Sequence, residues 1–261
     1  MRIAILGAGV IGVTGAYFLQ REGHDVVVVD RQPVAANETS WGNAGMIAPG
    51  HSYTWGSPKA PMILLRSLWR DDQALRLKLQ ADPRMWAWCL RFLRNCTAER
   101  ARINTTRKLK LCLYSQEALH EVVAETGIEY HKRDGGALYL YRDQASLDGG
   151  AAKMRILTEN GMQLELLDRD GCARVEPALE PTKHKIAGGI FAPSDESGDC
   201  NLFTRKLADL LAERGVEFHY DTRIERLETA GDRISRVVTD QGEVKADLYV
   251  VSTGVYAPHL V

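Results

Sequence analysis

The chain has 261 residues, of which 45% are hydrophobic and 26% charged, and its formal net charge is −1. These values are typical of a globular protein with room for one large domain or two smaller ones. The balanced charge argues against nucleic acid as a partner. No apolar run reaches the roughly 18 residues of a membrane-spanning helix. Five cysteines without a CxxC pair argue against a metal site or disulfide framework, so we expect reduced thiols and a cytoplasmic protein.

A nucleotide-binding motif opens the chain. An apolar run at residues 3–6 leads into Gly7, Gly9 and Gly12, which have the spacing GxGxxG, and residues 13–21 are predicted to form a helix. A second apolar run, residues 26–29, ends at Asp30, 18 residues after Gly12. A strand–helix–strand dinucleotide-binding unit has about 20 residues between its glycines and its acid, so the whole pattern predicts such a unit.

Each residue of this motif has a physical role in dinucleotide binding. Gly7 permits a tight turn, Gly9 lets the backbone approach a pyrophosphate, and Gly12 lets the helix pack on the strand. The helix N-terminus attracts phosphates, and Asp30 would accept hydrogen bonds from an adenosine ribose. The alternative is a glycine-rich turn without a ligand. The agreement of all the parts in spacing favours the dinucleotide site.

The remaining elements follow in chain order. Residues 31–61 are rich in Gly, Pro, Ser and Asn and predict a long functional loop, and residues 62–127 predict helices interrupted near Pro83. A helix at residues 201–215 would be capped by Asn201 and stopped by Gly215. The other predicted elements are a strand around residues 137–141, a helix at 151–161 ending at Gly161, and strands at 216–220, 234–239 and 247–252.

This order predicts an α/β fold with a discontinuous Rossmann-like domain. Residues 1–61 and 195–261 would form that domain, and residues 62–194 would supply a helical segment and part of an inserted α+β substrate domain. The last strand ends at Thr253 and Gly254. If it is parallel, these residues lie beside the glycine motif and the same cofactor. The alternative is an ordinary glycine at the end of a strand.

The stretch ETSWGNAGMIAPG at residues 38–50 is more specific to one protein family than the glycine motif is. It resembles the small subunit of bacterial D-amino acid dehydrogenases, within the D-amino-acid oxidase family of flavoproteins. Further resemblance lies in RNC at 94–96, VEPAL at 175–179, DESGDC at 195–200, LFT at 202–204 and KAD at 245–247. Met46 departs from the pattern, since glutamine is common there, and a change beside the flavin bears on substrate preference.

The resemblance implies FAD as the cofactor. Asp30 and Arg31 would then lie at the adenosine, Ile224 would flank the adenine, and Thr253 and Gly254 would close over the pyrophosphate side. The residues implied along the ribityl chain and isoalloxazine are Ser40, Asn43, Ala44, Gly45 and Met46. Residues 40–46 contain neither His nor Cys, the residues that carry a covalent flavin, so we expect noncovalent FAD.

The resemblance also implies a reaction, the oxidative deamination of D-amino acids to 2-oxo acids and ammonia, with electrons passed to a respiratory quinone or carrier. The alternatives are a glycine, sarcosine or proline oxidase or dehydrogenase of the same family, and a cofactor-binding chain without activity. Related proteins continue beyond residue 261, so we expect this portion alone to be inactive. No catalytic residue is assigned. His51 and Tyr53 follow the flavin loop, and either face substrate or belong to a surface loop.

Residues 62–110 are strongly basic and contain three tryptophans and Phe92. Such helices bind membrane interfaces. The resemblance implies electron transfer at the inner membrane, and it would place the protein on the cytoplasmic face of that membrane. The alternative is a pair of helices with a solvated basic face and aromatic residues in the core. The twelve basic residues are Arg66, Arg70, Arg76, Lys78, Arg84, Arg91, Arg94, Arg100, Arg102, Arg107, Lys108 and Lys110, against the acidic residues Asp71, Asp72, Asp82 and Glu99.

Overall fold

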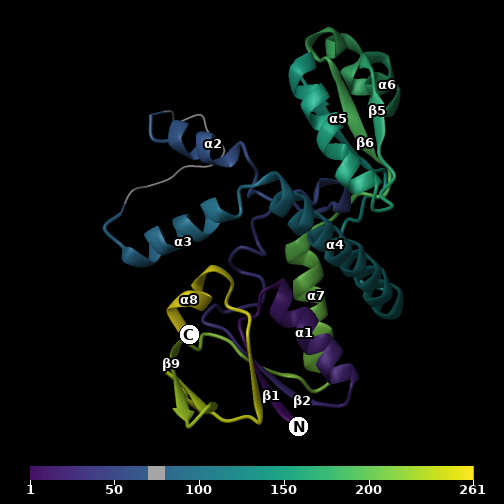
Figure 1. The fold of residues 1–261 in the computed structure, drawn as a ribbon. Coiled ribbons are helices and arrows are strands. Elements are labelled where there is room, and N and C mark those ends of the chain that lie inside the picture. Colours follow the sequence, from purple (N-terminus) through teal and green to yellow (C-terminus); the bar gives the residue numbers. More distant parts are fainter. Residues whose placement is uncertain (70–79, 261) are drawn as a thin grey trace. The chain divides into compact units, whose positions relative to one another are not determined.

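The computed structural model describes residues 1–69 and 80–260 (Figure 1). Contacts divide the chain into two compact units. Unit 1 comprises Met1–Gly45, Val123–Lys132 and Gly198–Val261, and unit 2 comprises Met46–Val122 and Arg133–Ser197. Arg70, Asp71, Asp72, Arg76 and Lys78 of the basic segment lie outside the described residues.

The unit boundaries differ from the predicted positions after residues 61 and 194, and strand pairing explains much of the difference. The short strand β3 (Met46–Ile47) pairs antiparallel with β7 (Glu196–Ser197), which ties the second half of the loop to unit 2. Residues 123–132 belong to unit 1, where Tyr130 packs edge-on against Phe203 with ring centroids 5.4 Å apart.

Unit 1 is built on a four-stranded parallel sheet. Its strand order is β12 (Leu248–Val251), β1 (Arg2–Leu6), β2 (Asp25–Val29) and β8 (Glu217–His219). Helix α1 (Val10–Arg21) joins β1 to β2, and helix α7 (Cys200–Glu213) leads into β8. This is the predicted α/β arrangement, and β12 is parallel to β1, as the prediction for Thr253 and Gly254 required.

Apolar side chains on one face of this sheet pack against a second, antiparallel sheet. The second sheet has the order β11 (Gly242–Val244), β10 (Arg233–Thr239) and β9 (Ile224–Ala230). Alternate residues of β1 and β2 point to one face because the side-chain period of a strand is two. The resulting buried cluster contains Ala4, Leu6, Val27, Val29, Val237 and Val244. Figure 1 shows α1 and α7 side by side, away from β9.

The start of α7 differs from the prediction. Asp199, and not Asn201, is the N-cap, and its carboxylate accepts a hydrogen bond from the Leu202 N–H at 2.9 Å. Asn201 instead donates its side-chain N–H to the Ala36 carbonyl at 2.9 Å, a contact made by the loop that follows β2. Gly215 has a φ of +90° and follows the helix, as predicted. The chain ends in η3 (Gly254–Tyr256) and α8 (Ala257–Leu260).

Unit 2 contains a small antiparallel sheet with the order β4 (Ala137–Tyr141), β6 (Gly188–Ala192) and β5 (Glu165–Leu167). Helix α5 (Gln144–Thr158) is longer than the predicted 151–161, because Asp143 caps it and the helix continues through Gly149 and Gly150. The unit also contains α6 (Arg169–Val175) and the 3-10 helices η1 (Pro49–His51) and η2 (Pro177–Lys185).

The predicted helical region 62–127 contains three described helices: α2 (Ala60–Arg66), α3 (Pro83–Arg94) and α4 (Ala98–Thr126). Pro83 occupies the first turn of α3, where its missing N–H costs nothing, and Asp82 caps the helix by accepting from the Arg84 N–H at 2.8 Å. Leu109 of α4 is fully buried with Leu157 and Met162. Among the described helices, none is both long and apolar enough to cross a membrane.

Candidate cofactor site

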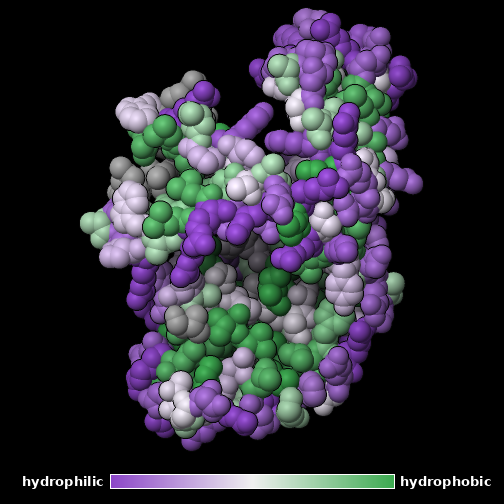
Figure 2. All heavy atoms as spheres, viewed as in Figure 1, coloured by the Kyte–Doolittle hydropathy of each residue, from purple (hydrophilic) through white to green (hydrophobic). Residues whose placement is uncertain are grey.

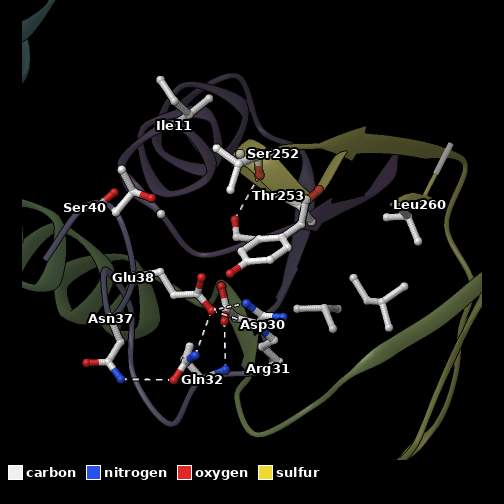
Figure 3. A pocket seen from close by; sticks show the side chains of 18 of the residues that line it. Ile11, Asp30, Arg31, Gln32, Asn37, Glu38, Ser40, Ser252, Thr253 and Leu260 are labelled. Atoms are coloured by element: carbon white, nitrogen blue, oxygen red, sulfur yellow. Dashed lines mark hydrogen bonds and ion pairs between the residues drawn. The ribbon is translucent and has the colours of Figure 1, made fainter. Parts of the chain in front are cut away.

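A cavity of about 620 Å³ lies in unit 1 at the carboxyl ends of β1, β2 and β12. Its walls come from the glycine motif, the end of β2, the loop that follows β2, the start of β9 and the turn after β12 (Figure 3). Ligands bind outside the carboxyl ends of parallel strands in open α/β sheets. Eight of the predicted cofactor residues line this cavity: Gly7, Gly9, Asp30, Arg31, Ser40, Ile224, Thr253 and Gly254.

The glycine motif is tightly packed against the end of β12. Gly7 has a φ of +110°, and a Cβ there would lie 2.8 Å from the Ser252 carbonyl oxygen. A Cβ on Gly12 would lie 1.9 Å from the Gly7 carbonyl oxygen, so Gly12 serves packing and does not line the cavity. At Gly9, the Ser40 hydroxyl oxygen at 3.3 Å would be the nearest atom to a Cβ. The motif therefore keeps backbone at the cavity wall where side chains would intrude.

Asp30 connects the end of β2 to the glycine motif. One carboxylate oxygen accepts a hydrogen bond from the Ala8 N–H at 2.6 Å, and the other accepts from the Gln32 N–H at 2.8 Å. Two backbone donors hold the carboxylate in one orientation at the cavity wall. A fixed acceptor at this place suits the hydroxyls of an adenosine ribose.

Arg31 and Glu38 form an ion pair on the same wall. The Arg31 Nε and Nη2 donate to one Glu38 oxygen at 2.8 and 2.5 Å, and the Gln32 side-chain N–H donates to the same oxygen at 2.8 Å. The guanidinium carbon lies 4.2 Å from the centre of the Tyr256 ring. Burial favours the neutral form of Glu38, but the hydrogen bonds from Gln32 and Arg31 outweigh it and lower its pKa.

An unsatisfied hydroxyl at the cavity wall fits a bound ligand. The Thr253 Oγ is buried, and no hydrogen-bond partner reaches it from the described part of the chain. Buried hydroxyls almost always have partners, so this atom is suited to donate to a ligand. At the start of α1, Gly9 has no side chain to cap the helix and the first turn holds no acidic residue. Together with Asp30, these residues fit the pyrophosphate and ribose of a dinucleotide.

The remaining predicted residues lie outside the cavity lining, in the segment that leads to unit 2. Asn43 accepts a hydrogen bond from the Gly45 N–H at 2.7 Å, and Gly45 has a φ of +60°. A Cβ on Gly45 would lie 2.1 Å from the Gly198 carbonyl oxygen, so this glycine permits a close backbone approach. Ala44 lies between them, and Met46 begins β3 with 49% of its surface exposed.

Sequence reasoning missed several residues of the cavity. Glu38 begins the stretch at residues 38–50 and Asn37 directly precedes it, but the sequence assigns neither of them a role. Ser252 directly precedes the predicted Thr253. Tyr256 lies two residues after Gly254 and has no motif of its own. The missed lining residues with polar side chains include Gln32, Asn37, Glu38, Thr222, Arg223, Glu225, Ser252, Tyr256 and His259.

A second polar cluster lies within unit 2 and includes His51 and Tyr53. His51 stacks on Tyr139 with ring centroids 4.7 Å apart. The Tyr53 ring packs edge-on against the His51 ring, with centroids 5.5 Å apart. Asp195 is fully buried and accepts hydrogen bonds from the Gly50 N–H at 2.8 Å and the Tyr139 hydroxyl at 2.7 Å. Burial raises the pKa of Asp195 and lowers that of His51. Packing and hydrogen bonds thus hold residues 50–53 in place.

The fold and the cavity are those of a Rossmann-like dinucleotide-binding domain, and comparisons with known proteins identify the family. The model of the DAO family, described as FAD dependent oxidoreductase, matches residues 2–261, so the chain belongs to this family. The family is FAD-dependent, which gives FAD as the cofactor and agrees with the resemblance seen in the sequence.

Curated relatives match over the whole chain. The chain is 45% identical over 261 residues to a D-amino acid dehydrogenase of Agrobacterium fabrum, and 46% identical over 258 residues to one of Azorhizobium caulinodans. The matches cover 100% and 99% of this chain but 62% of each relative. The chain therefore spans about 62% of the length of these relatives.

Solved structures share the fold at low sequence identity. The glycine oxidase of Bacillus cereus aligns with a TM-score of 0.67 at 20% identity, over 99% of this chain and 56% of that protein. The L-proline dehydrogenase of P. horikoshii aligns with a TM-score of 0.65 at 17% identity, over 99% of this chain and 54% of that protein. At these identities the alignments show the fold alone.

Proposed function

We propose that the protein acts in the FAD-dependent oxidation of D-amino acids to 2-oxo acids and ammonia. The observation that carries this proposal is the 45% identity, over the whole chain, to a D-amino acid dehydrogenase. The cavity supports it, because it joins a glycine motif, a fixed carboxylate and an unsatisfied hydroxyl in one place. In this proposal unit 1 is the cofactor domain, and unit 2 supplies part of the substrate domain.

The residues of unit 1 would bind and orient a noncovalent FAD. Asp30 would accept from the ribose, the backbone at Gly7 and Gly9 would lie against the pyrophosphate, and Thr253 would donate its free hydroxyl. Ile224 and Arg31 would flank the adenosine, while Ser40 and residues 43–46 would lead toward the flavin ring. Bound FAD supplies the acceptor for the hydride that leaves the amino acid Cα.

Anaerobic addition of D-alanine to the flavin-loaded, full-length protein is expected to bleach the flavin absorbance, whereas L-alanine leaves it unchanged. The physical reason is that only one enantiomer presents its Cα–H to the flavin once its carboxylate and side chain are bound. Visible spectroscopy measures the change. Bleaching by glycine, sarcosine or L-proline, with no response to D-amino acids, would instead assign the protein to the alternative activities of the family.

We further infer that α3 contacts an anionic membrane surface, where a respiratory quinone or carrier accepts the electrons. No residue of α3 is buried within the described chain. Trp86 and Leu90 are 46% and 64% exposed, and Trp88 is 58% exposed and stacks on Phe92. Figure 2 shows hydrophobic and hydrophilic surface interleaved over α2 and α3. This exposure favours an interfacial role over the alternative in which the aromatic residues fill a core.

Substituting Leu90→Glu is expected to weaken binding to vesicles of phosphatidylcholine and phosphatidylglycerol by about tenfold, because an exposed leucine that would enter the lipid is lost and the new charge repels the anionic lipid. Co-sedimentation measures the bound fraction. The matched control is Leu166→Glu, because Leu166 is 53% exposed on β5 of the same unit. Equal binding of the two variants, or no preference for anionic lipid in the unmodified protein, would contradict the membrane assignment.

A further inference from the structure

The adenosine end of the cavity contains a cation that is already neutralised. Arg31 follows Asp30 directly, at the end of β2. In dinucleotide-binding folds, an arginine near this position accommodates the 2′-phosphate of NADP. A free Arg31 would therefore attract any adenosine group that carries a 2′-phosphate.

Glu38 occupies one of the two pairs of donors with which Arg31 could hold such a phosphate. The Arg31 Nε and Nη2 form one bidentate edge of the guanidinium, and both donate to the same Glu38 oxygen. The Tyr256 ring covers one face of the same guanidinium at 4.2 Å. Glu38 is itself held by the Gln32 side chain at 2.8 Å, and Gln32 by Asn37 at 3.1 Å, so the pair is fixed from both sides (Figure 3).

The charges around this pair also disfavour a second phosphate. Asp30 is close in sequence to both members of the pair and accepts from the Gln32 N–H, so two carboxylates and one guanidinium lie at this wall. Elsewhere in the lining, Arg223 and Glu225 carry opposite charges, and His259 is the remaining basic side chain. A dianionic 2′-phosphate would lose its hydration here beside an Arg31 that already has a carboxylate partner.

We propose that Glu38 is a specificity-determining residue, which restricts the cavity to adenosine groups with a free 2′-hydroxyl by holding Arg31. This inference rests on the proposed cofactor site and adds a role for a residue to which the FAD assignment gives none. FAD has the free hydroxyl, so the Glu38–Arg31 pair would admit it while excluding phosphorylated dinucleotides of similar size.

Calorimetric titration of the full-length protein freed of FAD tests the proposal, with ADP and adenosine 2′,5′-bisphosphate as probes. The unmodified protein is expected to bind ADP at least about tenfold more tightly. In Glu38→Gln, the preference for ADP is expected to fall by about tenfold, the scale of one charge-assisted hydrogen bond to the released Arg31. The double variant Glu38→Gln with Arg31→Gln is expected to restore most of the preference.

The control is Glu225→Gln, which makes the same change in charge within the same cavity. Glu225 lies 3.9 Å from Arg226, and its carboxylate has no described contact with Arg31. The preference of this variant is expected to shift by less than about threefold, because Arg31 stays paired. An unchanged preference in Glu38→Gln, or an equal shift in Glu225→Gln, would overturn the role of Glu38. Absence of ADP binding by the unmodified protein would instead overturn the proposed cofactor site and, with it, this inference.

The unmodified protein also gives an answer that does not depend on any variant. If the extra phosphate meets net negative charge, raising the salt from about 50 to about 500 mM screens that repulsion and lowers the preference for ADP. If Arg31 instead binds the phosphate, the same change weakens adenosine 2′,5′-bisphosphate more strongly, and the preference rises. A rise would contradict the proposal even where Glu38→Gln fails to fold.

Discussion

Replacing Gly12 with valine is expected to abolish FAD binding and to lower the free energy of unfolding by about 3 kcal/mol or more. An ideal Cβ at this position would lie 1.9 Å from the Gly7 carbonyl oxygen and 2.8 Å from the Ser252 hydroxyl oxygen. The first of these atoms is backbone, so no rotamer change relieves the clash. Relief requires α1 to move away from β1, and that movement opens the cavity.

Urea unfolding followed by circular dichroism measures the loss of stability, and the flavin absorbance of the purified protein measures binding. The control is Gly15→Val in the same helix, where nothing in the described chain lies within 4 Å of an added Cβ. This control is expected to keep both the fold and the flavin, since valine is a better helix residue than glycine. A Gly12→Val protein of unchanged stability would show that the motif is packed differently.

Replacing Gly9 with valine is expected to lower FAD affinity at least about 100-fold while the fold survives. Gly9 has a φ of −72°, which any residue adopts, and its Cβ would meet only the Ser40 hydroxyl at 3.3 Å. The cost to the protein is therefore smaller than at Gly12, because the neighbour that must move is the end of a side chain and not backbone. The two methyl groups instead take space at the cavity wall, where a pyrophosphate approaches the backbone.

Flavin fluorescence titration of the apoprotein measures this affinity, and the unfolding midpoint shows whether the protein is intact. Gly9→Val should resemble Gly15→Val in stability and Gly12→Val in flavin content. Stoichiometric flavin in purified Gly9→Val protein would place the pyrophosphate elsewhere. Loss of both flavin and fold would mean that Gly9, like Gly12, serves packing.

The elements that could be predicted from the sequence are those whose signals are local. The βαβ unit at residues 1–30 combines two fully apolar runs with glycines at fixed spacing, and the structure places β1, α1 and β2 there. The strand β6 was missed because its glycines serve close packing: a Cβ on Gly188 would lie 2.4 Å from the Leu167 carbonyl oxygen. The strand β9 was missed because charged residues dominate its sequence, IERLETA.

The features that could not be predicted from the sequence depend on contacts between distant segments. Both Asp199 and Asn201 are good N-caps, and only the folded position of Ala36 determines that Asn201 is used for a different hydrogen bond. The glycine motif and Asp30 were found because they form one continuous unit. The group of Arg31, Glu38 and Tyr256 was not, because no motif marks Glu38 and because Tyr256 reaches Arg31 only after β12 has joined the sheet.

The position of β12 next to β1 has a consequence for biosynthesis. The ribosome completes β1 and β2 first, yet their outer neighbours in the parallel sheet are β8 and β12, at residues 217–219 and 248–251. Until they emerge, the nascent chain carries two apolar strands with unpaired edges, a state prone to aggregation and slow to resolve. The cavity is consequently complete only after β12 has emerged, because Ser252, Thr253 and Gly254 form part of its wall.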